Sequence, residues 1–416
     1  MLDPLLQGDE NPLQIHYSDF DVANRILLSG HSHQAWPDVA RHGQMQAYLD
    51  AATFVDDKWE AAFAKVDDVR NFYANLMKEP DAEIALAGST HELLIRFLSC
   101  LPFRKHSKPK IVTTNAEFHA MRRQLDRLAE EGVEIERVEL EPMETLDQRL
   151  CEVLDQETIA VMVSGVFFET GQIFSNVGTV ATAAADQGIP CLVDLYHVLN
   201  IVPFDIAAWN LRSAFLVGGG YKYLQAGEGN CFMRVPVHHK IDGIAQVTSA
   251  KDGVPANHIH RPVITGWFAE FATLNKQRSD EQVGYGLGHS AFAGSTYDPT
   301  SHYRAASVFK FFQEQQLTDI RLRNINQQQL KMLSDGISKL SISPDTLALP
   351  PQPLEDLGGF LPLQTDIAEQ WVKRLKENGI SSDSRGRHLR LGPAPYVSRK
   401  QIEQTIEAIG TISKRM

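Results

Sequence analysis

Short apolar runs alternate with helical patterns through the middle of the chain, and this alternation constrains the fold more than any other feature. Seven such runs are IALAG (84–88), KIVTT (110–114), VEIERVEL (133–140), AVMVSGVFF (160–168), CLVDL (191–195), AFLVGG (214–219) and CFMRV (231–235). Continuous apolar strands separated by helices are typical of a mostly parallel sheet that helices cover on both faces. Such sheets bind ligands beyond the carboxyl ends of their strands. We therefore expect functional residues directly after these runs.

The length of the chain predicts more than one structural unit. It has 416 residues, whereas a single domain has about 100–200. The alternating pattern ends near residue 235, a loop-rich stretch follows, and helical patterns return near residue 300. We predict an N-terminal arm and helix at 1–49 that join the small domain, a large ligand-binding domain at 50–285, and a small C-terminal domain at 286–416.

The composition excludes several classes of function. The chain has 40 Lys and Arg against 52 Asp and Glu, a formal net charge of −12, whereas a nucleic-acid-binding surface needs a basic face. No apolar run approaches the roughly 18–20 residues of a membrane-spanning helix. The four cysteines lack CxxC spacing, which is typical of reduced core thiols. We expect a cytoplasmic protein that acts on a small molecule, with no nucleic-acid or membrane partner.

Two charged residues follow neighbouring runs of the predicted sheet. Lys222 comes after a strand that ends in three glycines, and a poorly solvated lysine has a lowered pKa, which frees its amine for Schiff-base chemistry. Asp194 ends the preceding run, with His197 three residues later. A buried carboxylate needs a partner, which the protonated pyridine nitrogen of an electron-sink cofactor would supply. Taken singly, Lys222 also fits a surface lysine in a turn, and Asp194 also fits a turn cap.

A third candidate element lies at the start of a predicted helix. Gly88, Ser89 and Thr90 follow the run at 84–88. Backbone amides at a helix start, together with two hydroxyls, can hold an anion such as a phosphate. Serine and threonine are also ordinary helix N-caps, so this element alone fits both interpretations.

In this order, the three elements resemble those of the pyridoxal-phosphate-dependent enzymes of fold type I. The chain resembles their class V aminotransferase group, and within it kynureninase and its relatives. The matching segments are GHSHQAWP (30–37), FFETG (167–171), VDLYHVLNIVPFDI (193–206), GGYKYLQAGEG (219–229), ITGWF (264–268) and LRLGPAPY (389–396). The resemblance implies the aspartate-aminotransferase-like α/β fold, a large mostly parallel sheet domain between helices plus a smaller C-terminal α+β domain. It also implies pyridoxal 5′-phosphate as the cofactor and a homodimer with shared active sites.

The resemblance further implies roles for individual residues. Lys222 forms the aldimine with the cofactor and later moves protons, Asp194 pairs with the pyridinium nitrogen, and His197 lies near the phenolic oxygen. The residues that hold the phosphate are Ser89, Thr90 and Tyr221, and those that complete its pocket from a neighbouring subunit are Trp267 with Ser295 or Thr296.

Other residues are implied to contact the cofactor face or the substrate. Phe118 is the closest match to the residue that stacks on the cofactor, and His119 is the next. Arg390 is expected to bind the α-carboxylate of an amino-acid substrate, because its planar guanidinium donates two parallel hydrogen bonds. His31 and His119 are further candidates for substrate binding.

The expected reaction is kynureninase-like, the hydrolysis of the Cβ–Cγ bond of a β-acyl alanine such as kynurenine. The chain departs from kynureninase at 117–119, at Phe167 and at 267–270. Two alternatives share the early steps: transamination by a class V aminotransferase, and β-elimination of the selenocysteine or cysteine-sulfinate type. Because no cysteine follows Cys231, we do not expect the persulfide relay of a cysteine desulfurase, which needs a late, mobile cysteine.

Histidine pairs offer a more remote alternative, a metal-dependent hydrolase. The pairs are His31-x-His33, His238-His239 and His258-x-His260. Neither His-x-His pair follows a convincing strand, and no carboxylate spacing accompanies them. We therefore predict no metal site.

Overall fold

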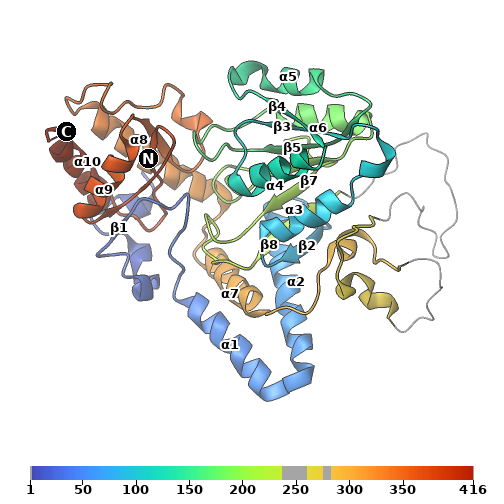
Figure 1. Cartoon of the computed structure of the whole chain (residues 1–416). Helices are drawn as coiled ribbons and strands as arrows, with labels where there is room; N and C mark the ends of the chain where they lie inside the picture. Colours follow the sequence, from blue (N-terminus) through green and yellow to red (C-terminus); the bar gives the residue numbers. More distant parts are fainter. Residues whose placement is uncertain (1, 237–259, 275–282, 416) are drawn as a thin grey trace.

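The computed structural model describes residues 2–236, 260–274 and 283–415, and its centre is a seven-stranded sheet (Figure 1). In spatial order the strands are β2 (Glu83–Ala87), β8 (Cys231–Val235), β7 (Phe215–Gly218), β6 (Cys191–Asp194), β5 (Thr158–Ser164), β3 (Lys110–Thr114) and β4 (Glu134–Val138). Strands β4, β3, β5, β6 and β7 run parallel, whereas β8 is antiparallel to β7 and β2. The predicted mostly parallel sheet is confirmed.

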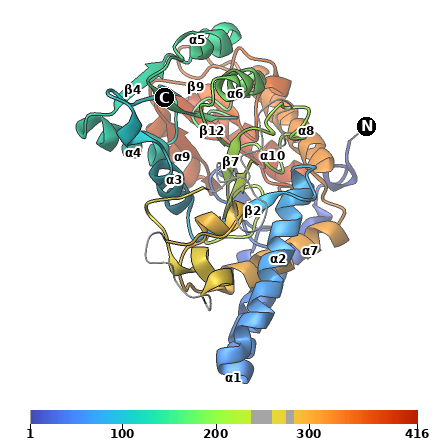
Figure 2. The same ribbon diagram turned by 90° about the vertical axis from the view of Figure 1, so that its right-hand side faces the viewer.

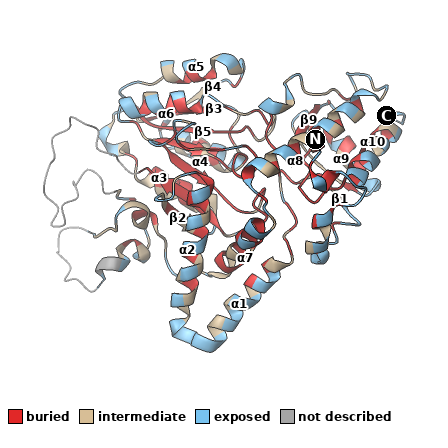
Figure 3. Cartoon of the chain, turned by 180° about the vertical axis from the view of Figure 1, so that it is seen from behind, coloured by how far each residue is buried: buried red, intermediate tan, exposed pale blue. Residues whose placement is uncertain are grey.

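The two faces of the sheet pack into two separate hydrophobic cores. In β5, Val161 and Val163 belong to one core, and Ala160 and Met162 belong to the other, as the two-residue period of a strand requires. The helices on the first face are α2 (Lys58–Leu76), α5 (Leu146–Glu152) and α6 (Val177–Asp186), and those on the second are α3 (Thr90–Ser99) and α4 (His119–Glu130). Burial on both faces explains why the central strands are apolar throughout (Figure 3).

The C-terminal part forms a second α+β unit, and the N-terminal arm is joined to it. Its helices are α8 (Asp319–Ser338), α9 (Ala368–Glu377) and α10 (Arg399–Ser413), and its sheet has the order β11 (Asp383–Arg385), β12 (His388–Leu391), β9 (Leu361–Gln364). The arm strand β1 (Ile26–Leu27) pairs in parallel with β10 (Ile380–Ser381). The arm therefore reaches the small domain through backbone hydrogen bonds. The exact boundaries of the three parts stay a prediction.

Helices α1 (Val39–Phe54) and α2 form a hairpin that projects from the body of the molecule (Figures 1 and 2). Helix α7 (Thr300–Glu314) packs against both. The approach of α1 to α7 is so close that a Cβ atom at Gly43 would collide with the backbone oxygen of Tyr303. In the part of the chain that the structure describes, none of the helices combines the length and the apolar character that crossing a membrane requires.

A buried ion pair connects the end of α2 to the sheet. Arg234 in β8 is fully buried, and its Nε and Nη2 atoms donate to the two carboxylate oxygens of Glu79 at 2.8 and 2.6 Å. Its Nη1 atom donates to the backbone oxygens of Arg212 and Ala214. Each nitrogen of the guanidinium thus donates at least one hydrogen bond, and pairing of this kind is the condition under which a buried charge is tolerated.

We predict that Glu79→Ala destabilises the protein, because it leaves the buried Arg234 charge without its counterion. The free energy of unfolding should fall by about 3–5 kcal/mol, measured by urea denaturation. The control is Asp68→Ala, which removes an exposed pair with Lys65 and should cost less than about 1 kcal/mol. Equal small losses in the two variants would contradict the prediction.

Candidate active site

The candidate site lies at the carboxyl edge of the parallel strands. β6 ends at Asp194, β7 ends at Gly218 four residues before Lys222, and β3 ends at Thr114 shortly before Phe118. The carboxyl ends of parallel strands meet at one edge of a sheet, so side chains that follow different strands come together. The structure brings these three side chains together, as the contacts of Lys222 show.

The Lys222 amine is buried among aromatic rings. The residue is 6% exposed, and its Nζ atom lies 4.7 Å from the centre of the Tyr196 ring and 5.4 Å from that of Phe118. Burial lowers the pKa of Lys222 to about 7, although the Asp194 carboxylate acts in the opposite direction. An amine in this environment has a substantial uncharged fraction near neutral pH, and that fraction is nucleophilic.

The glycines before Lys222 serve local packing. A Cβ atom at Gly219 would collide with the Tyr196 hydroxyl, and one at Gly220 would collide with Asn230. The strand can therefore lead into the buried lysine only where these positions carry no side chain.

Asp194 presents a carboxylate beside Lys222. Its Oδ1 atom accepts a hydrogen bond of 2.7 Å from the backbone N–H of Tyr196. Burial raises the pKa of Asp194, and the Tyr196 amide and the Lys222 charge act against that rise. Within the described residues, no hydrogen bond reaches its second oxygen, Oδ2. That oxygen can accept a hydrogen bond from an N–H group of a ligand.

His197 links Lys222 to a buried tyrosine. Its Nε2 atom lies 2.8 Å from Lys222 Nζ, and its Nδ1 atom lies 3.3 Å from the Tyr223 hydroxyl. Burial and the neighbouring Lys222 charge hold the pKa of His197 well below its usual range. A neutral imidazole can accept a hydrogen bond from the Lys222 amine through Nε2 and so fix the position of that amine.

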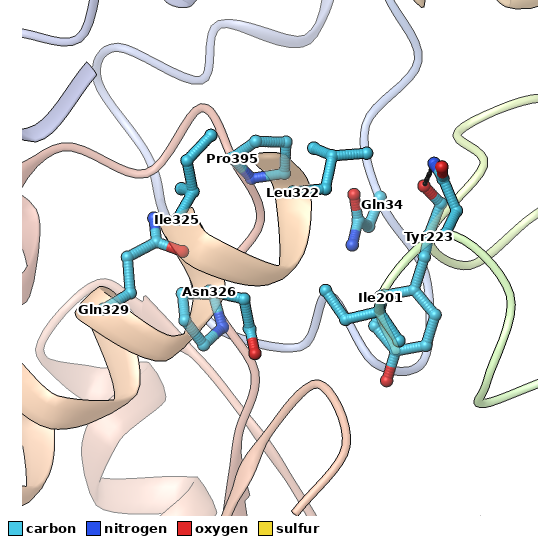
Figure 4. Close-up of a pocket in the computed structure, with 10 residues that line it drawn as sticks. Gln34, Ile201, Tyr223, Leu322, Ile325, Asn326, Gln329 and Pro395 are labelled. Carbon is cyan, nitrogen blue, oxygen red and sulfur yellow. Dashed lines mark hydrogen bonds between the residues drawn. The ribbon is translucent and has the colours of Figure 1, made fainter. Parts of the chain in front are cut away.

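The Tyr223 ring also lies against the small domain. Figure 4 shows Tyr223 and Gln34 on one side of a small cavity, with Asn326 and Gln329 of α8 on the other. The backbone of Tyr223 is fixed by Asn200, whose amide donates to its carbonyl oxygen at 3.0 Å. The lysine loop is therefore held from both domains.

Of the two residues proposed to stack on the cofactor, the structure places Phe118 nearer to Lys222. His119 is exposed at the first position of α4, and its ring packs edge-on against Phe168.

Sequence reasoning missed Glu117, the residue that precedes Phe118. This buried carboxylate accepts hydrogen bonds from Thr114 and Ser164, and burial raises its pKa to about 7. The signal for it was an acidic residue between a buried strand and a helix.

The predicted phosphate cradle forms the N-terminus of α3. Ser89 is the N-cap, and its hydroxyl accepts a hydrogen bond from the Glu92 backbone amide. The Thr90 hydroxyl is buried and has no oxygen or nitrogen partner among the described residues. Tyr221 lies on the other side of the lysine loop, with its ring stacked on His33 at 4.8 Å and tilted against Tyr196 at 4.9 Å.

The structure places two of the three residues proposed to act from a neighbouring subunit near the predicted phosphate cradle of their own chain. Ser295 and Thr296 line a cavity beside β2 together with Gly88, close to the cradle of the same chain. Trp267 is 43% exposed and packs against Phe268. A contribution to the site of a second copy stays a prediction.

Arg390 is buried and already has a carboxylate partner. Its Nε and Nη2 atoms donate to the two oxygens of Asp383 at 2.9 and 2.6 Å, and Nη1 donates to the backbone oxygen of Phe168. His31 is also buried, and its Nε2 atom lies 2.7 Å from Asp383 Oδ1. Sequence reasoning missed Asp383, although it stands directly opposite Arg390 in the antiparallel register of β11 and β12.

The histidine pairs do not converge on a metal site within the described residues, which contain no group of three or more His, Cys, Asp or Glu suited to hold an ion. His31 points to Asp383, whereas His33 lies 3.7 Å from Glu228. The pair His238-His239 and His258 lie outside the described residues.

Three comparisons place the chain among known proteins. No family model matches it. It is 21% identical to the uncharacterized aminotransferase YcbU of Bacillus subtilis over 88% of each chain. It is 22% identical to the kynureninase of Geobacillus thermodenitrificans, over 64% of this chain and 57% of that protein. It is 24% identical to the mitochondrial cysteine desulfurase of Arabidopsis thaliana, over 37% of this chain and 34% of that protein.

Solved structures resemble the chain along almost its whole length. The cystine C–S lyase C-DES in complex with cysteine persulfide has a TM-score of 0.76 at 15% identity and covers 94% of this chain and 98% of its own. The apo cysteine desulfurase from Thermococcus onnurineus has a TM-score of 0.77 at 15% identity and covers both chains completely (100%). The chain thus has the fold of the pyridoxal-phosphate-dependent enzymes of fold type I. Within that class it is related to the class V group, of which kynureninase is only one member.

We predict that the Lys222 amine titrates near pH 7 in the protein without cofactor, because burial disfavours its charged form. In an NMR titration of protein with 13C-labelled lysine, one signal should have its midpoint there, while exposed lysines titrate near pH 10.4. Absence of that signal in Lys222→Met assigns it. A Lys222 midpoint above pH 10 would contradict the prediction.

Proposed function

We propose that this protein is a pyridoxal-phosphate-dependent lyase that breaks the Cβ–S or Cβ–Se bond of a small α-amino acid. The observation that carries the proposal is the likeness of the chain, along almost its whole length, to a cystine C–S lyase and to cysteine desulfurases. Kynureninase-like hydrolysis, the reaction expected first, has less support, because the kynureninase relative matches only 64% of this chain. The alternative of β-elimination therefore becomes the main proposal.

Pyridoxal 5′-phosphate, the predicted cofactor, is confirmed by the enzyme class of the relatives and structural neighbours. The residues at the sheet edge suit this cofactor. The N-terminus of α3, where the Thr90 hydroxyl has no oxygen or nitrogen partner among the described residues, suits a phosphate group. The free oxygen of Asp194 suits a protonated pyridine nitrogen, and the Phe118 ring offers a flat apolar face for the cofactor ring. Lys222 would hold the aldehyde carbon. These assignments are proposals from the geometry of the site.

When bound, the cofactor supplies an electron sink for the bonding electrons released at the substrate Cα. The neutral Lys222 amine accepts the Cα proton, and the neutral His197 ring, whose Nε2 atom lies 2.8 Å from Nζ, accepts a hydrogen bond from the amine and orients it. The sulfur leaves Cβ with the electron pair of the broken bond. With the uptake of one water, the net products are pyruvate, ammonia and a thiol, or a persulfide when the substrate is a disulfide.

The four thiols of the chain are poorly suited to carry the released sulfur. Cys191 and Cys231 are buried, and Cys100 and Cys151 are half-buried. Burial raises the pKa of the Cys100 and Cys191 thiols to about 12, so they are protonated and weakly nucleophilic. We therefore propose that sulfur leaves as a free thiol or a small-molecule persulfide and that no protein persulfide forms.

We also propose that the protein is a homodimer. Large apolar side chains are exposed on the segments that surround Ser295 and Thr296, and they are Val263, Ile264, Trp267, Phe271 and Leu287. A second copy would cover this surface and would bring Trp267 toward a neighbouring site, as the resemblance implies.

Transamination is the second candidate. It is favoured by the relationship to an aminotransferase over 88% of both chains. The same Lys222 amine would then return the proton to the cofactor carbon and not release a group from Cβ. The two candidates differ in their products, a keto acid with an aminated acceptor against pyruvate, ammonia and a sulfur species.

We predict that borohydride reduction attaches the cofactor to Lys222. Mass spectrometry of peptides from the reduced wild-type protein should find the added mass on Lys222 alone, and Lys222→Ala should carry none. The control is Lys110→Ala, which changes a buried lysine paired with Asp155 at 2.5 Å in another part of the molecule. Attachment that persists in Lys222→Ala would contradict the proposed role.

We predict that L-cystine, L-cysteine, L-selenocysteine or L-cysteine sulfinate is turned over faster than kynurenine, with release of a sulfur or selenium species. The double variant Cys100→Ser/Cys151→Ser should keep this activity within about twofold, because no thiol relay is involved. Product analysis by mass spectrometry is the measurement. Release of anthranilate from kynurenine, or formation of a keto acid only when an amino-group acceptor is present, would contradict the lyase proposal. Loss of sulfur release in the double variant would contradict the absence of a thiol relay.

A further inference from the structure

Two buried side chains, His31 and Arg390, form one hydrogen-bonded unit with Asp383, whose side chain is 21% exposed. His31 comes from the N-terminal arm, Asp383 from β11 and Arg390 from β12. Asp383 Oδ1 receives both His31 Nε2 at 2.7 Å and Arg390 Nε at 2.9 Å, while its Oδ2 receives Arg390 Nη2 at 2.6 Å. Burial tends to raise the pKa of Asp383, but the hydrogen bonds from His31 and Arg390 hold it well below its usual range. Asp383 is therefore a carboxylate anion at neutral pH.

The pairing with Asp383 does not exhaust the donors of Arg390. A guanidinium has five N–H groups. Asp383 takes two of them and the backbone oxygen of Phe168 takes a third, which leaves two N–H groups on the terminal nitrogens. The three occupied donors fix the plane of the guanidinium. Among the described residues, one N–H group on each terminal nitrogen thus stays available, and bidentate binding of a second carboxylate requires this number of donors.

His31 in turn fixes Asp383. Burial lowers the pKa of His31 to about 4, so the ring is neutral and donates through Nε2 to Asp383. Its Nδ1 atom has no hydrogen-bond partner among the described residues, and a Cβ atom at Gly392 would collide with it. The ring also packs on Phe360, with the centroids 4.6 Å apart. Packing on both sides leaves the His31 ring one orientation.

The unit belongs to the candidate site. The charges of Arg390 and Asp383 both act on the Lys222 amine, and that of Arg390 also acts on His197. Phe168, whose backbone oxygen holds Arg390, packs edge-on against Phe118 at 5.3 Å. The guanidinium therefore lies within the same group of side chains as the proposed reaction centre.

We propose that Asp383, held by His31, is the positioning residue that orients Arg390 to bind the α-carboxylate of the substrate. This inference rests on the proposed function, in which Arg390 contacts that carboxylate. Asp383 contacts neither substrate nor cofactor in this proposal and acts through Arg390. The arm contributes to substrate recognition because it carries His31, the residue that fixes the orientation of Asp383.

The direction in which Asp383→Asn changes the affinity for a substrate carboxylate separates a positioning role from a purely electrostatic one. Asp383→Asn removes a negative charge beside Arg390, and on Coulomb's law alone a substrate carboxylate should then bind more tightly. If Asp383 orients the guanidinium, the variant should bind the carboxylate less tightly, because an amide offers one acceptor where the arginine edge needs two. A support role within the hairpin alone predicts no change in carboxylate preference.

The experiment compares L-alanine with ethylamine, which lacks only the carboxylate, as ligands of the holoenzyme. Binding of each is measured from the change in visible absorbance of the bound cofactor, a readout that needs no turnover. Wild-type protein should bind L-alanine more tightly than ethylamine. Asp383→Asn should reduce this preference about tenfold or more, the usual effect of losing a hydrogen bond between charged groups.

Two further variants keep the test valid if Asp383→Asn folds poorly. His31→Gln keeps an N–H donor near the position of Nε2 and should retain most of the preference, whereas His31→Leu removes the donor and should lose it. The matched control is Asp366→Asn, which removes an exposed carboxylate paired with Arg387 in the same domain and should change nothing. Thermal unfolding of each holoenzyme monitors folding.

The outcomes separate the two proposals. If the wild-type protein shows no preference for L-alanine, Arg390 does not bind a carboxylate and the proposed function fails in that part. If the wild type shows the preference and Asp383→Asn keeps or increases it, the positioning role is wrong while the function stands. Equal losses in His31→Gln and His31→Leu would remove His31 from the proposal.

Discussion

Burial of the Lys222 amine is the constraint on which the rest of the site depends. A charged ammonium in this position would lose its hydration without full compensation, and the protein accommodates it by lowering the pKa of Lys222 to about 7. The surrounding rings of Tyr196 and Phe118 exclude water, and His197 supplies a neutral hydrogen-bond partner. The same burial that makes the lysine costly makes it reactive, so stability and chemistry are linked at one atom.

The N-terminal arm and the small domain complete what the sheet begins. Gln225, three residues after Lys222, donates to Gln34 of the arm at 2.8 Å and accepts from the Tyr17 hydroxyl at 2.6 Å. Across the cavity of Figure 4, Asn326 and Gln329 of α8 donate to backbone oxygens of the small domain. The arm thus bonds to the lysine loop through Gln34 and to the Asp383–Arg390 pair through His31, which explains why a segment near residue 30 belongs to the site.

The sequence predicted the sheet well because its strands are buried on both faces and read as continuous apolar runs. Lys222 and Asp194 could be found for the same reason, since a charged residue directly after such a run is unusual. Glu117 stands in a similar place, between a buried strand and a helix, but its pairing with Ser164 joins segments that are distant in the sequence. Asp383 has no signal of this kind. Asp383 is an ordinary polar residue in the sequence, and only the register of β11 against β12 places it opposite Arg390.

The residue beside Lys222 also bears on the reaction. In the proposed assignment Phe118 stacks on the cofactor, and a phenyl ring can neither donate nor accept a proton. Proton transfer near the cofactor face would then fall to Lys222, whose amine His197 holds by a hydrogen bond. Hydrolysis of a Cβ–Cγ bond needs an activated water in addition to the base at Cα, whereas β-elimination needs one base and a leaving group that departs as an anion. Sulfur and selenium leave in this way without protonation, because their conjugate acids are far stronger than those of carbon. We therefore regard a site with one buried amine base, Lys222, and the apolar Phe118 ring beside it as better matched to elimination than to hydrolysis.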